Sequence, residues 1–425
     1  MSKIHNHKIE TPKEKQNRHK AMEAIKVINT LKEEFKNPLE SMEYFYGLFE
    51  EVYCHQKELH ADKVKVGTMC IQIPSEIIYA LDGVPVRLCN GFYTDDEIGS
   101  DLLPQKACPL VKATVGHFAS GNFSDKPHFI YSPTTCDQKT KAGATIEGFG
   151  YEVIDVDFPR LKESEISREY FRRSVKNFSV DLSKRMGKKL TKKSLKNSIA
   201  KVGYAQSLYH QLCEYRKKDE VVIRGVDMFL LTNAFFFDKI DSWIDAITKV
   251  LAECKERYTQ GVSVAAKVSP RIVYTGSPPI FPNYKIPMLL EEADAVVVAD
   301  ETCSSNRMFN DRVAVDEWFV NDMLDSMADK YLKACTCPIF TKNEDRIRRI
   351  IELVRSYNAD GVVYQAFAGC TVYELEQRSV LAAMEREGIP ILYLESDYSP
   401  SQGGQLSTRV EAFIESLKMK KRKAV

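Results

Sequence analysis

The sequence contains no long apolar run and has almost no net charge. Its 60 Lys and Arg residues nearly balance its 59 Asp and Glu residues, so the formal charge is +1. That balance argues against binding to nucleic acid or to an anionic membrane through bulk charge. No segment approaches the roughly 20 consecutive apolar residues that a membrane helix requires. We therefore expect neither a nucleic-acid partner nor a membrane partner.

Motifs for export and for nucleotide binding are absent as well. The opening stretch MSKIHNHKIETPKEKQNRHK is polar and lacks the apolar core of a signal peptide, so we expect a cytoplasmic protein. Neither the Walker pattern (GxxxxGKS or GxxxxGKT) nor a GxGxxG after a predicted strand occurs. ATP and dinucleotides are thus not evident ligands of this chain.

Cysteine, by contrast, is abundant, with 11 residues. Structural disulfides are rare in a reducing cytoplasm, which favours metal binding or redox chemistry. The short-spaced CxxC pairs of a structural zinc site are missing, and all eight histidines precede Leu212. The alternative for any one cysteine is a buried free thiol, which packs as a small hydrophobe.

Short β-rich runs alternate with amphipathic segments, which predicts parallel sheets covered by helices. Helical patterns cover 11–62 and 164–218, and another covers 238–258. The predicted strands are 63–70, 84–90, 128–132 and 151–157, followed by 271–275, 295–299, 361–365 and 390–395. Further helices are expected at 74–81, 109–118, 316–332, 343–357, 372–387 and 406–417, and the basic tail 418–425 is expected to be frayed.

This pattern predicts an α/β fold with two similar parallel-sheet halves of the Rossmann or flavodoxin type. A helical N-terminal segment (1–62) precedes the first half (63–160), and a helical middle segment (161–265) precedes the second (266–425).

Six cysteines occur in the same order in both predicted halves. A strand-end cysteine is followed by a Cys-Pro pair and then by a second strand-end cysteine: Cys89, Cys108, Cys136, and again Cys303, Cys337, Cys370. The carboxyl edge of a parallel sheet is where loops converge on ligands. Proline suits the first position of a helix, so Cys108 and Cys337 are each expected to cap one, where the helix dipole favours a thiolate.

Three thiolates per half suit iron–sulfur chemistry better than a four-ligand structural zinc. Two cubanes, separate or joined, would use six such ligands. Cys335 is an alternative to Cys337, and only the proline favours Cys337. The remaining cysteines (Cys54, Cys70, Cys213 and Cys254) are expected to be free thiols.

The catalytic acid or base stays open. Glu147 and Glu374 flank cysteines and could transfer protons, and His117 lies near the expected cluster in the sequence. For each of the three, an ordinary structural or surface role is the alternative.

Five motifs in this chain resemble the family of 2-hydroxyacyl-CoA dehydratase D-components and benzoyl-CoA reductase subunits. They are PSEIIYALDGVPVRLCNG, ACPLVKATVG, PTTCDQKTKAG, ADGVVYQAFAGCTVYELE and GIPILYLESDYSPSQGGQLSTRVEAFIE. The resemblance covers about residues 60–417. It implies one 4Fe–4S cluster held by Cys108, Cys136 and Cys370, a grouping that crosses the two halves, whereas the internal order would allow 89/108/136 and 303/337/370.

The additional cysteines resemble the double-cubane branch of this family. That resemblance implies an 8Fe–9S cluster between the halves, a homodimer, and electrons from a separate 4Fe–4S ATPase. The function expected is ATP-dependent reduction of a small molecule. The alternatives are a 2-hydroxyacyl-CoA dehydratase subunit with one 4Fe–4S cluster and a non-catalytic electron-transfer protein.

Overall fold

The computed structural model describes residues 10–314 and 319–424 and contains two four-stranded parallel sheets with the same strand order. The first runs β2-β1-β3-β4 and the second β6-β5-β7-β8. The strands are β1 (Val64–Thr68), β2 (Gly83–Arg87), β3 (Phe129–Pro133), β4 (Val153–Val156), β5 (Arg271–Gly276), β6 (Val296–Glu301), β7 (Gly361–Phe367) and β8 (Ile391–Ser396). The prediction of an α/β fold with two similar halves is confirmed.

Helices fill the crossovers between the parallel strands, as parallel pairing requires. In the first half these are α3 (Ser75–Ala80), α4 (Tyr93–Leu102), α5 (Pro109–Ser120) and α6 (Asp137–Glu147). In the second half they are α11 (Lys285–Glu292), α12 (Asn306–Phe309), α13 (Val320–Lys333), α14 (Glu344–Ser356) and α15 (Thr371–Arg386), and α16 (Gly403–Ala424) follows β8. Strands β5, β6 and β7 are buried along their whole length, which agrees with the short apolar run that each contains.

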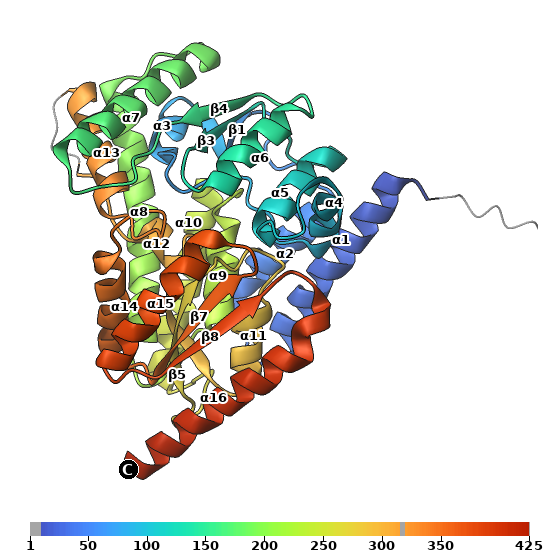
Figure 1. Ribbon diagram of the computed structural model, residues 1–425, viewed down its shortest axis with the longest axis vertical. Helices are drawn as coiled ribbons and strands as arrows, with labels where there is room; N and C mark the ends of the chain where they lie inside the picture. Colours follow the sequence, from blue (N-terminus) through green and yellow to red (C-terminus); the bar gives the residue numbers. More distant parts are fainter. Residues whose placement is uncertain (1–9, 315–318, 425) are drawn as a thin grey trace, which may run out of the picture.

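The remaining helices form the two predicted helical segments. The N-terminal segment contains α1 (Pro12–Asn29), which continues into a π-helical turn (Thr30–Glu34), then a short 3-10 turn (Glu40–Met42) and α2 (Glu43–Tyr53). The middle segment contains α7 (Glu165–Met186), α8 (Lys192–Arg216), α9 (Gly225–Ala234) and α10 (Ile240–Gln260). Helix α8 packs on α3 of the first half and on β6 and α12 of the second, so it contacts both halves (Figure 1).

Two sequence expectations differ from the structure at helix ends. The helix expected from residue 316 has its first residues in 315–318, outside the described residues, and α13 begins at Val320. The tail expectation is wrong, because α16 continues to Ala424. Lys418 lies 3.3 Å from a carboxylate oxygen of Asp294, and Lys421 lies 2.9 Å from one of Asp360. These ion pairs hold the basic helix against the second half.

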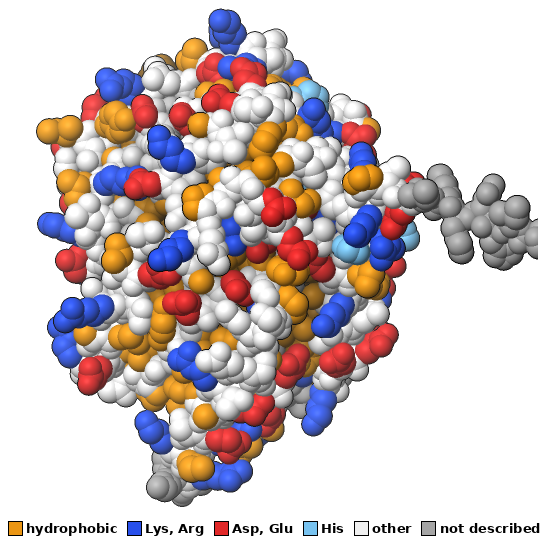
Figure 2. Space-filling model, turned by 45° about the vertical axis from the view of Figure 1, so that its right-hand side comes forward, with side chains coloured by type: hydrophobic (Ala, Val, Ile, Leu, Met, Phe, Trp, Pro, Cys, Tyr) orange, Lys and Arg blue, Asp and Glu red, His pale blue; other side chains and the backbone are white. Residues whose placement is uncertain are grey.

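The surface agrees with the balanced composition. Figure 2 shows acidic and basic side chains interspersed over one face, with hydrophobic side chains scattered between them. Within the described residues, no helix combines the length and the apolar character that crossing a membrane requires.

Helix α9 lies in the centre of the protein, and all ten of its residues are buried. Its first turn contains Asp227, a carboxylate that accepts a hydrogen bond of 3.2 Å from the Tyr46 hydroxyl. Burial raises the pKa of Asp227 to about 7, and the nearby Glu291 carboxylate adds to the shift. The folded protein therefore holds a proton on Asp227 more tightly than the unfolded chain does.

This shift predicts that Asp227→Asn stabilises the protein at alkaline pH. A carboxylate with a raised folded-state pKa stabilises least above that pKa, so stability should fall as pH rises from about 4 to about 7. Asparagine keeps the acceptor for Tyr46 without the charge. The variant should gain up to about 4 kcal/mol at pH 8 and little at pH 4.

Urea unfolding at both pH values measures the difference. Asp241→Asn is the control, because Asp241 is exposed on α10 and pairs with Lys201. Equal effects of the two substitutions at pH 8 would contradict the raised pKa of Asp227.

Candidate functional site

A cavity of about 340 Å³ lies where the carboxyl ends of both sheets face each other, and six cysteines line it. Three come from the first half and three from the second: Cys70, Cys108, Cys136, Cys303, Cys337 and Cys370. Five of the six cysteines selected from the sequence thus line one cavity. The sixth selected residue, Cys89, does not line it, and Cys70 does.

Three of these cysteines occupy the N-cap positions of helices. Cys108 precedes α5 with Pro109 at the first helical position, Cys136 precedes α6, and Cys370 precedes α15. The Cys136 sulfur accepts a hydrogen bond of 3.4 Å from the backbone N–H of Lys139. The positive ends of three helix dipoles therefore face the cavity and favour negative charge on its sulfurs.

Cys337 does not cap a helix, and the expectation that it would is wrong. Pro338 begins a turn that closes with the Phe340 N–H on the Cys337 carbonyl, and α14 starts only at Glu344. The N–H of Thr341 donates instead to the carbonyl of Arg160 in the first half. That long-range bond draws the chain away before a second helical turn can form.

The loops of Cys108 and Cys370 touch across the two halves. The two side chains share a hydrogen bond, which lowers the pKa of the Cys108 thiol and raises the pKa of the Cys370 thiol. Gln138 joins the same loops, because its amide oxygen accepts from the Cys108 N–H and its amide nitrogen donates to the Gly369 carbonyl, each at 2.7 Å. Cys136 is also close enough for its charge to raise the pKa of Cys370.

Gly369 makes this contact possible. Its φ is +81°, a left-handed conformation that side chains disfavour, and a Cβ there would lie 2.1 Å from the carbonyl oxygen of Lys106. Any larger residue would push the Cys370 loop away from the residues that precede Cys108.

Cationic side chains surround the sulfurs. Arg87 at the end of β2 donates to the Cys89 sulfur at 3.2 Å, and the Lys139 ammonium donates to the Met69 carbonyl at 2.7 Å. Burial opposes ionisation of Cys89, but Arg87 and Lys139 lower its pKa overall. Burial raises the pKa of Cys303 to about 11, although Arg87 and Arg307 oppose it. The environment therefore favours anionic sulfur more strongly at Cys89 than at Cys303.

Cys335 and Cys337 point to different places, although one residue separates them. Cys337 lines the large cavity, whereas Cys335 lines a smaller neighbouring one and accepts a 2.6 Å hydrogen bond from the Gln72 amide. Between them, the Thr336 hydroxyl donates to Glu301 at 2.5 Å. The turn therefore separates the two thiols between two cavities.

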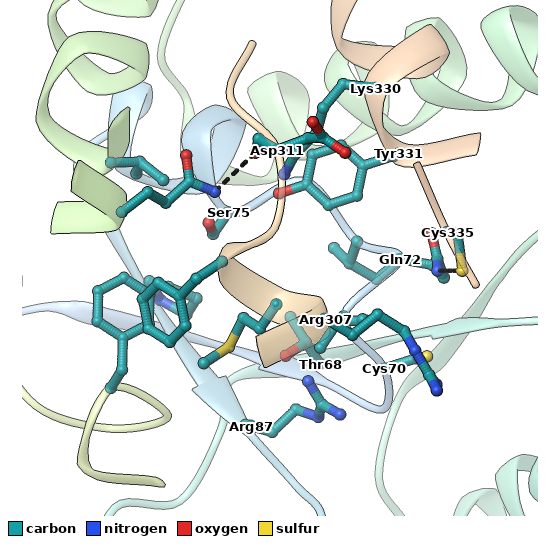
Figure 3. Close-up of a pocket in the computed structure, with 18 of the residues that line it drawn as sticks. Thr68, Cys70, Gln72, Ser75, Arg87, Arg307, Asp311, Lys330, Tyr331 and Cys335 are labelled. Atoms are coloured by element: carbon teal, nitrogen blue, oxygen red, sulfur yellow. Dashed lines mark hydrogen bonds between the residues drawn. The ribbon is translucent and has the colours of Figure 1, made fainter. Parts of the chain in front are cut away.

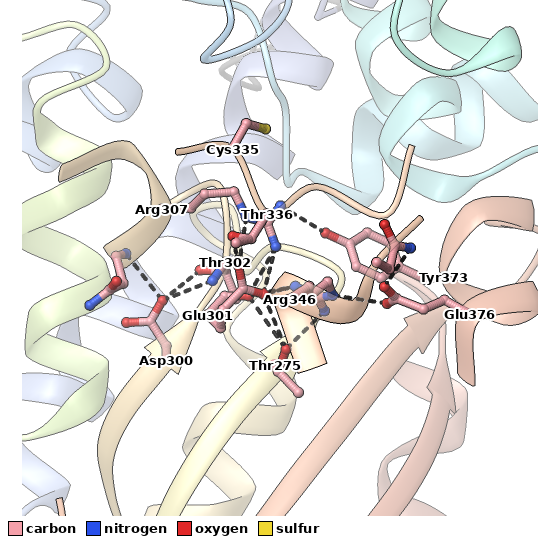
Figure 4. Close-up of polar contacts among 12 residues, drawn as sticks. Thr275, Asp300, Glu301, Thr302, Arg307, Cys335, Thr336, Arg346, Tyr373 and Glu376 are labelled. Carbon is pink, nitrogen blue, oxygen red and sulfur yellow. Dashed lines mark hydrogen bonds and ion pairs between the residues drawn. The ribbon is translucent and has the colours of Figure 1, made fainter. Parts of the chain in front are cut away.

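A buried ionic network lies beneath the cysteine loops of the second half (Figure 4). Glu301 at the end of β6 accepts from Thr336 and pairs with Arg307 and Arg346. Arg346 also donates to Glu376 at 2.9 Å. The neighbouring Asp300 accepts bonds from residues 302, 305 and 306 and so holds the loop that contains Cys303.

The candidate acids and bases lie in three different settings. Glu147 is exposed at the end of α6. Glu374 accepts a 2.7 Å hydrogen bond from the Gly369 N–H and so supports the Cys370 loop. His117 lies 3.2 Å from Asp95 and 3.2 Å from Lys20, and burial lowers its pKa. None of the three lines the large cavity.

The sequence analysis did not identify Cys70, Gln138, the half-buried Arg87 and Lys139, or the buried Arg307. A signal existed for Cys70 alone, because it follows β1 as Cys89 follows β2. Across residues 10–314 and 319–424, no three His, Cys, Asp or Glu side chains converge closely enough to hold a single metal ion. The thiols are instead spread around the cavity wall.

Comparison with known proteins agrees with the motifs. The family model of the 2-hydroxyglutaryl-CoA dehydratase D-component matches residues 70–417. YjiM of Escherichia coli (strain K12), which is named a dehydratase subunit, is 29% identical over 83% of this chain and 91% of that protein.

More distant relatives have similar coverage. The (R)-phenyllactyl-CoA dehydratase beta subunit of Clostridium sporogenes is 21% identical over 83% of this chain and 91% of its own length. A benzoyl-CoA reductase subunit of Thauera aromatica is 21% identical over 85% of this chain and 93% of its own length. Because the family model spans most of the sequence, the chain belongs to the 2-hydroxyglutaryl-CoA dehydratase D-component family, and its relatives include subunits of dehydratases and of a reductase.

Proposed function

We propose that this protein is the iron–sulfur component of an ATP-dependent reductase. The observation that carries the proposal is the cavity of about 340 Å³, whose wall contains six cysteines contributed equally by the two halves. Thiolate ligation without histidine is typical of iron–sulfur clusters.

The residues around the cavity suit a polynuclear cluster. A cluster of several irons is held at its periphery, so its thiolates must be spread around a cavity, as they are here. Three helix N-termini and the side chains of Arg87, Lys139 and Arg307 would offset its negative charge. When bound, such a cluster supplies electrons at low potential.

We further propose an 8Fe–9S double cubane held by six cysteines. The contact between Cys108 and Cys370, with Cys136 beside them, supports these three as one set. The second set would be Cys89, Cys303 and Cys337. Cys89 follows β2 and Cys303 follows β6, and these strands hold equivalent places in the two sheets.

The electrons would come from a separate ATPase with its own 4Fe–4S cluster, because the Walker motif is absent here. We propose a homodimer located in the cytoplasm. The chain's own residues would keep water from the cluster through the buried contacts of the Cys108 and Cys370 loops. Arg87 would stabilise the thiolate of Cys89 through its 3.2 Å hydrogen bond.

The names of the relatives favour a second candidate, a 2-hydroxyacyl-CoA dehydratase subunit. That function needs one 4Fe–4S cluster, for which Cys108, Cys136 and Cys370 suffice. A non-catalytic electron-transfer protein is the third candidate, and it would show no turnover with a reduced ATPase partner.

Iron content separates the first two candidates. Anaerobically purified protein should contain about eight irons per chain if two cubanes are bound and about four if one is bound. Serine at Cys108, Cys136, Cys303 or Cys370 should remove about half of the iron or more. Cys213→Ser is the matched control, because Cys213 is buried in α8 away from the cavity.

The position of the sixth ligand is tested in the same way. We expect Cys89→Ser to lower the iron content and Cys70→Ser to leave it unchanged. The opposite result would make Cys70 the ligand. Full iron content in both Cys89→Ser and Cys303→Ser would contradict the double cubane and favour the dehydratase.

Cys337 and Cys335 should respond differently to substitution. Because Cys337 lines the large cavity and Cys335 is bound to Gln72 beside the small one, Cys337→Ser should lose about half of the iron. Cys335→Ser should keep it. Iron analysis together with circular dichroism measures both effects, and loss of iron only from Cys335→Ser would reverse the assignment.

The proposal that a separate ATPase hydrolyses the ATP gives a further prediction. The isolated protein should not hydrolyse ATP, because it lacks a phosphate-binding loop. Reduction of a test substrate should require the ATPase, a strong reductant and ATP together, measured by omitting each in turn. Hydrolysis of ATP by the isolated chain that persists through repeated purification would refute this division.

A further inference from the structure

A second, smaller cavity adjoins the one that contains the cysteines. It measures about 80 Å³ and lies between the end of β1, helix α12 and the segment that links α13 to Cys335. The two cavities share Cys70, Gln72 and Arg307 in their walls. Figure 3 shows Arg87, Arg307 and Cys70 grouped at one end of it, with Lys330, Tyr331 and Asp311 at the other.

Buried polar atoms in its wall have no partner within the described part of the chain. Gln72 is only 3% exposed; its amide nitrogen donates to Cys335, but its amide oxygen has no hydrogen-bond partner. One terminal nitrogen of Arg87 is buried without an acceptor, while the Nε of Arg87 donates to Cys89. Buried polar groups are normally hydrogen-bonded, so the Arg87 nitrogen points to a missing acceptor and the Gln72 oxygen to a missing donor.

Among the residues that line this cavity, cations outnumber carboxylates, although burial lowers the pKa of Lys330 and the charge of the nearby, buried Glu76 opposes that shift. Arg87, Arg307 and Lys330 are three cations, whereas Asp311 is the only carboxylate among its lining residues, all of which the structure describes. Arg307 is already paired with Glu301 at 2.7 Å. No carboxylate of the described residues lies within ion-pairing distance of Lys330, whose ammonium lies 3.8 Å from the centre of the Tyr331 ring.

We propose that the smaller cavity is the substrate pocket and that it takes a small monovalent anion. This inference rests on the proposed function, since the substrate must lie next to the cluster that reduces it. The unpaired nitrogen of Arg87 supplies a donor at the inner end, and the Lys330 ammonium attracts the anion at the other.

The size of the cavity limits the ligand. A protein cavity of about 150 Å³ holds one benzene molecule, so a cavity of about 80 Å³ is too small for a benzene ring. A carboxylate as small as formate or acetate fits, whereas benzoate and a coenzyme A thioester do not. The size of the proposed pocket therefore favours a reductase that acts on small anions over an enzyme that acts on an acyl thioester.

Calorimetric titration of the anaerobically purified, iron-loaded protein tests the pocket directly. The probes are formate, acetate, acetamide as the neutral counterpart of acetate, and benzoate. Formate and acetate should bind, acetamide at least tenfold more weakly than acetate, and benzoate not at all. Met308→Trp, which fills the cavity from α12, should abolish formate binding.

Lys330→Met should weaken formate binding at least tenfold. Lys333→Met is the matched control, because Lys333 lies on the same helix, is half exposed and pairs with Asp329. Unchanged formate binding in Lys330→Met and Met308→Trp, or equal binding of acetate and acetamide, would contradict the proposed anion pocket.

Iron content, measured on the same samples, keeps the two proposals apart. Iron-loaded protein that binds neither anion would overturn the pocket and leave the proposed function standing. Loss of the proposed function would appear instead as wild-type protein with about four irons per chain, or with none.

Discussion

The turn that contains Cys335 and Cys337 depends on one buried carboxylate, Glu301. It lies at the end of β6, is almost fully buried, and receives hydrogen bonds from two arginines and the Thr336 hydroxyl. A buried charge that is not fully paired costs several kcal/mol. Each partner of Glu301 is therefore held in place, because its loss would leave the carboxylate incompletely paired. Its position thus fixes the turn that directs Cys337 to one cavity and Cys335 to the other.

The first half positions its cysteines differently, through helix starts and contacts with the second half. Cys108 and Cys136 cap helices, and Gln138 in the first turn of α6 links the Cys108 loop to Gly369 across the cavity. The Tyr398 hydroxyl donates to the carbonyl of Asn90 at 2.9 Å and adds a second link between the halves. The cavity therefore exists only where the two halves meet, and each half alone would present an open edge.

Cationic side chains contribute to both cavities. Arg307 lines both cavities, and Arg87 lines the smaller one while it donates to the Cys89 sulfur. Arg87 contributes to both, because its Nε faces the sulfur and one terminal nitrogen has no acceptor. A bound anion and an anionic cluster would therefore share one set of positive charges.

The sequence by itself determined the eight strands, the two similar halves and five of the cysteines in the large cavity. Those features follow from local pattern: apolar runs form buried parallel strands, and residues after such strands gather at one edge of the sheet. The tertiary structure decided the rest. Cys70 and Cys89 follow neighbouring strands, yet only Cys70 lines the cavity, and the Cys89 sulfur instead accepts a hydrogen bond from Arg87. Pro338 follows Cys337 as Pro109 follows Cys108, yet the backbone bond from Thr341 to Arg160 prevents a helix there. The bond from Thr341 to Arg160 joins loops about 180 residues apart in the chain, and no local pattern of side chains encodes such a contact.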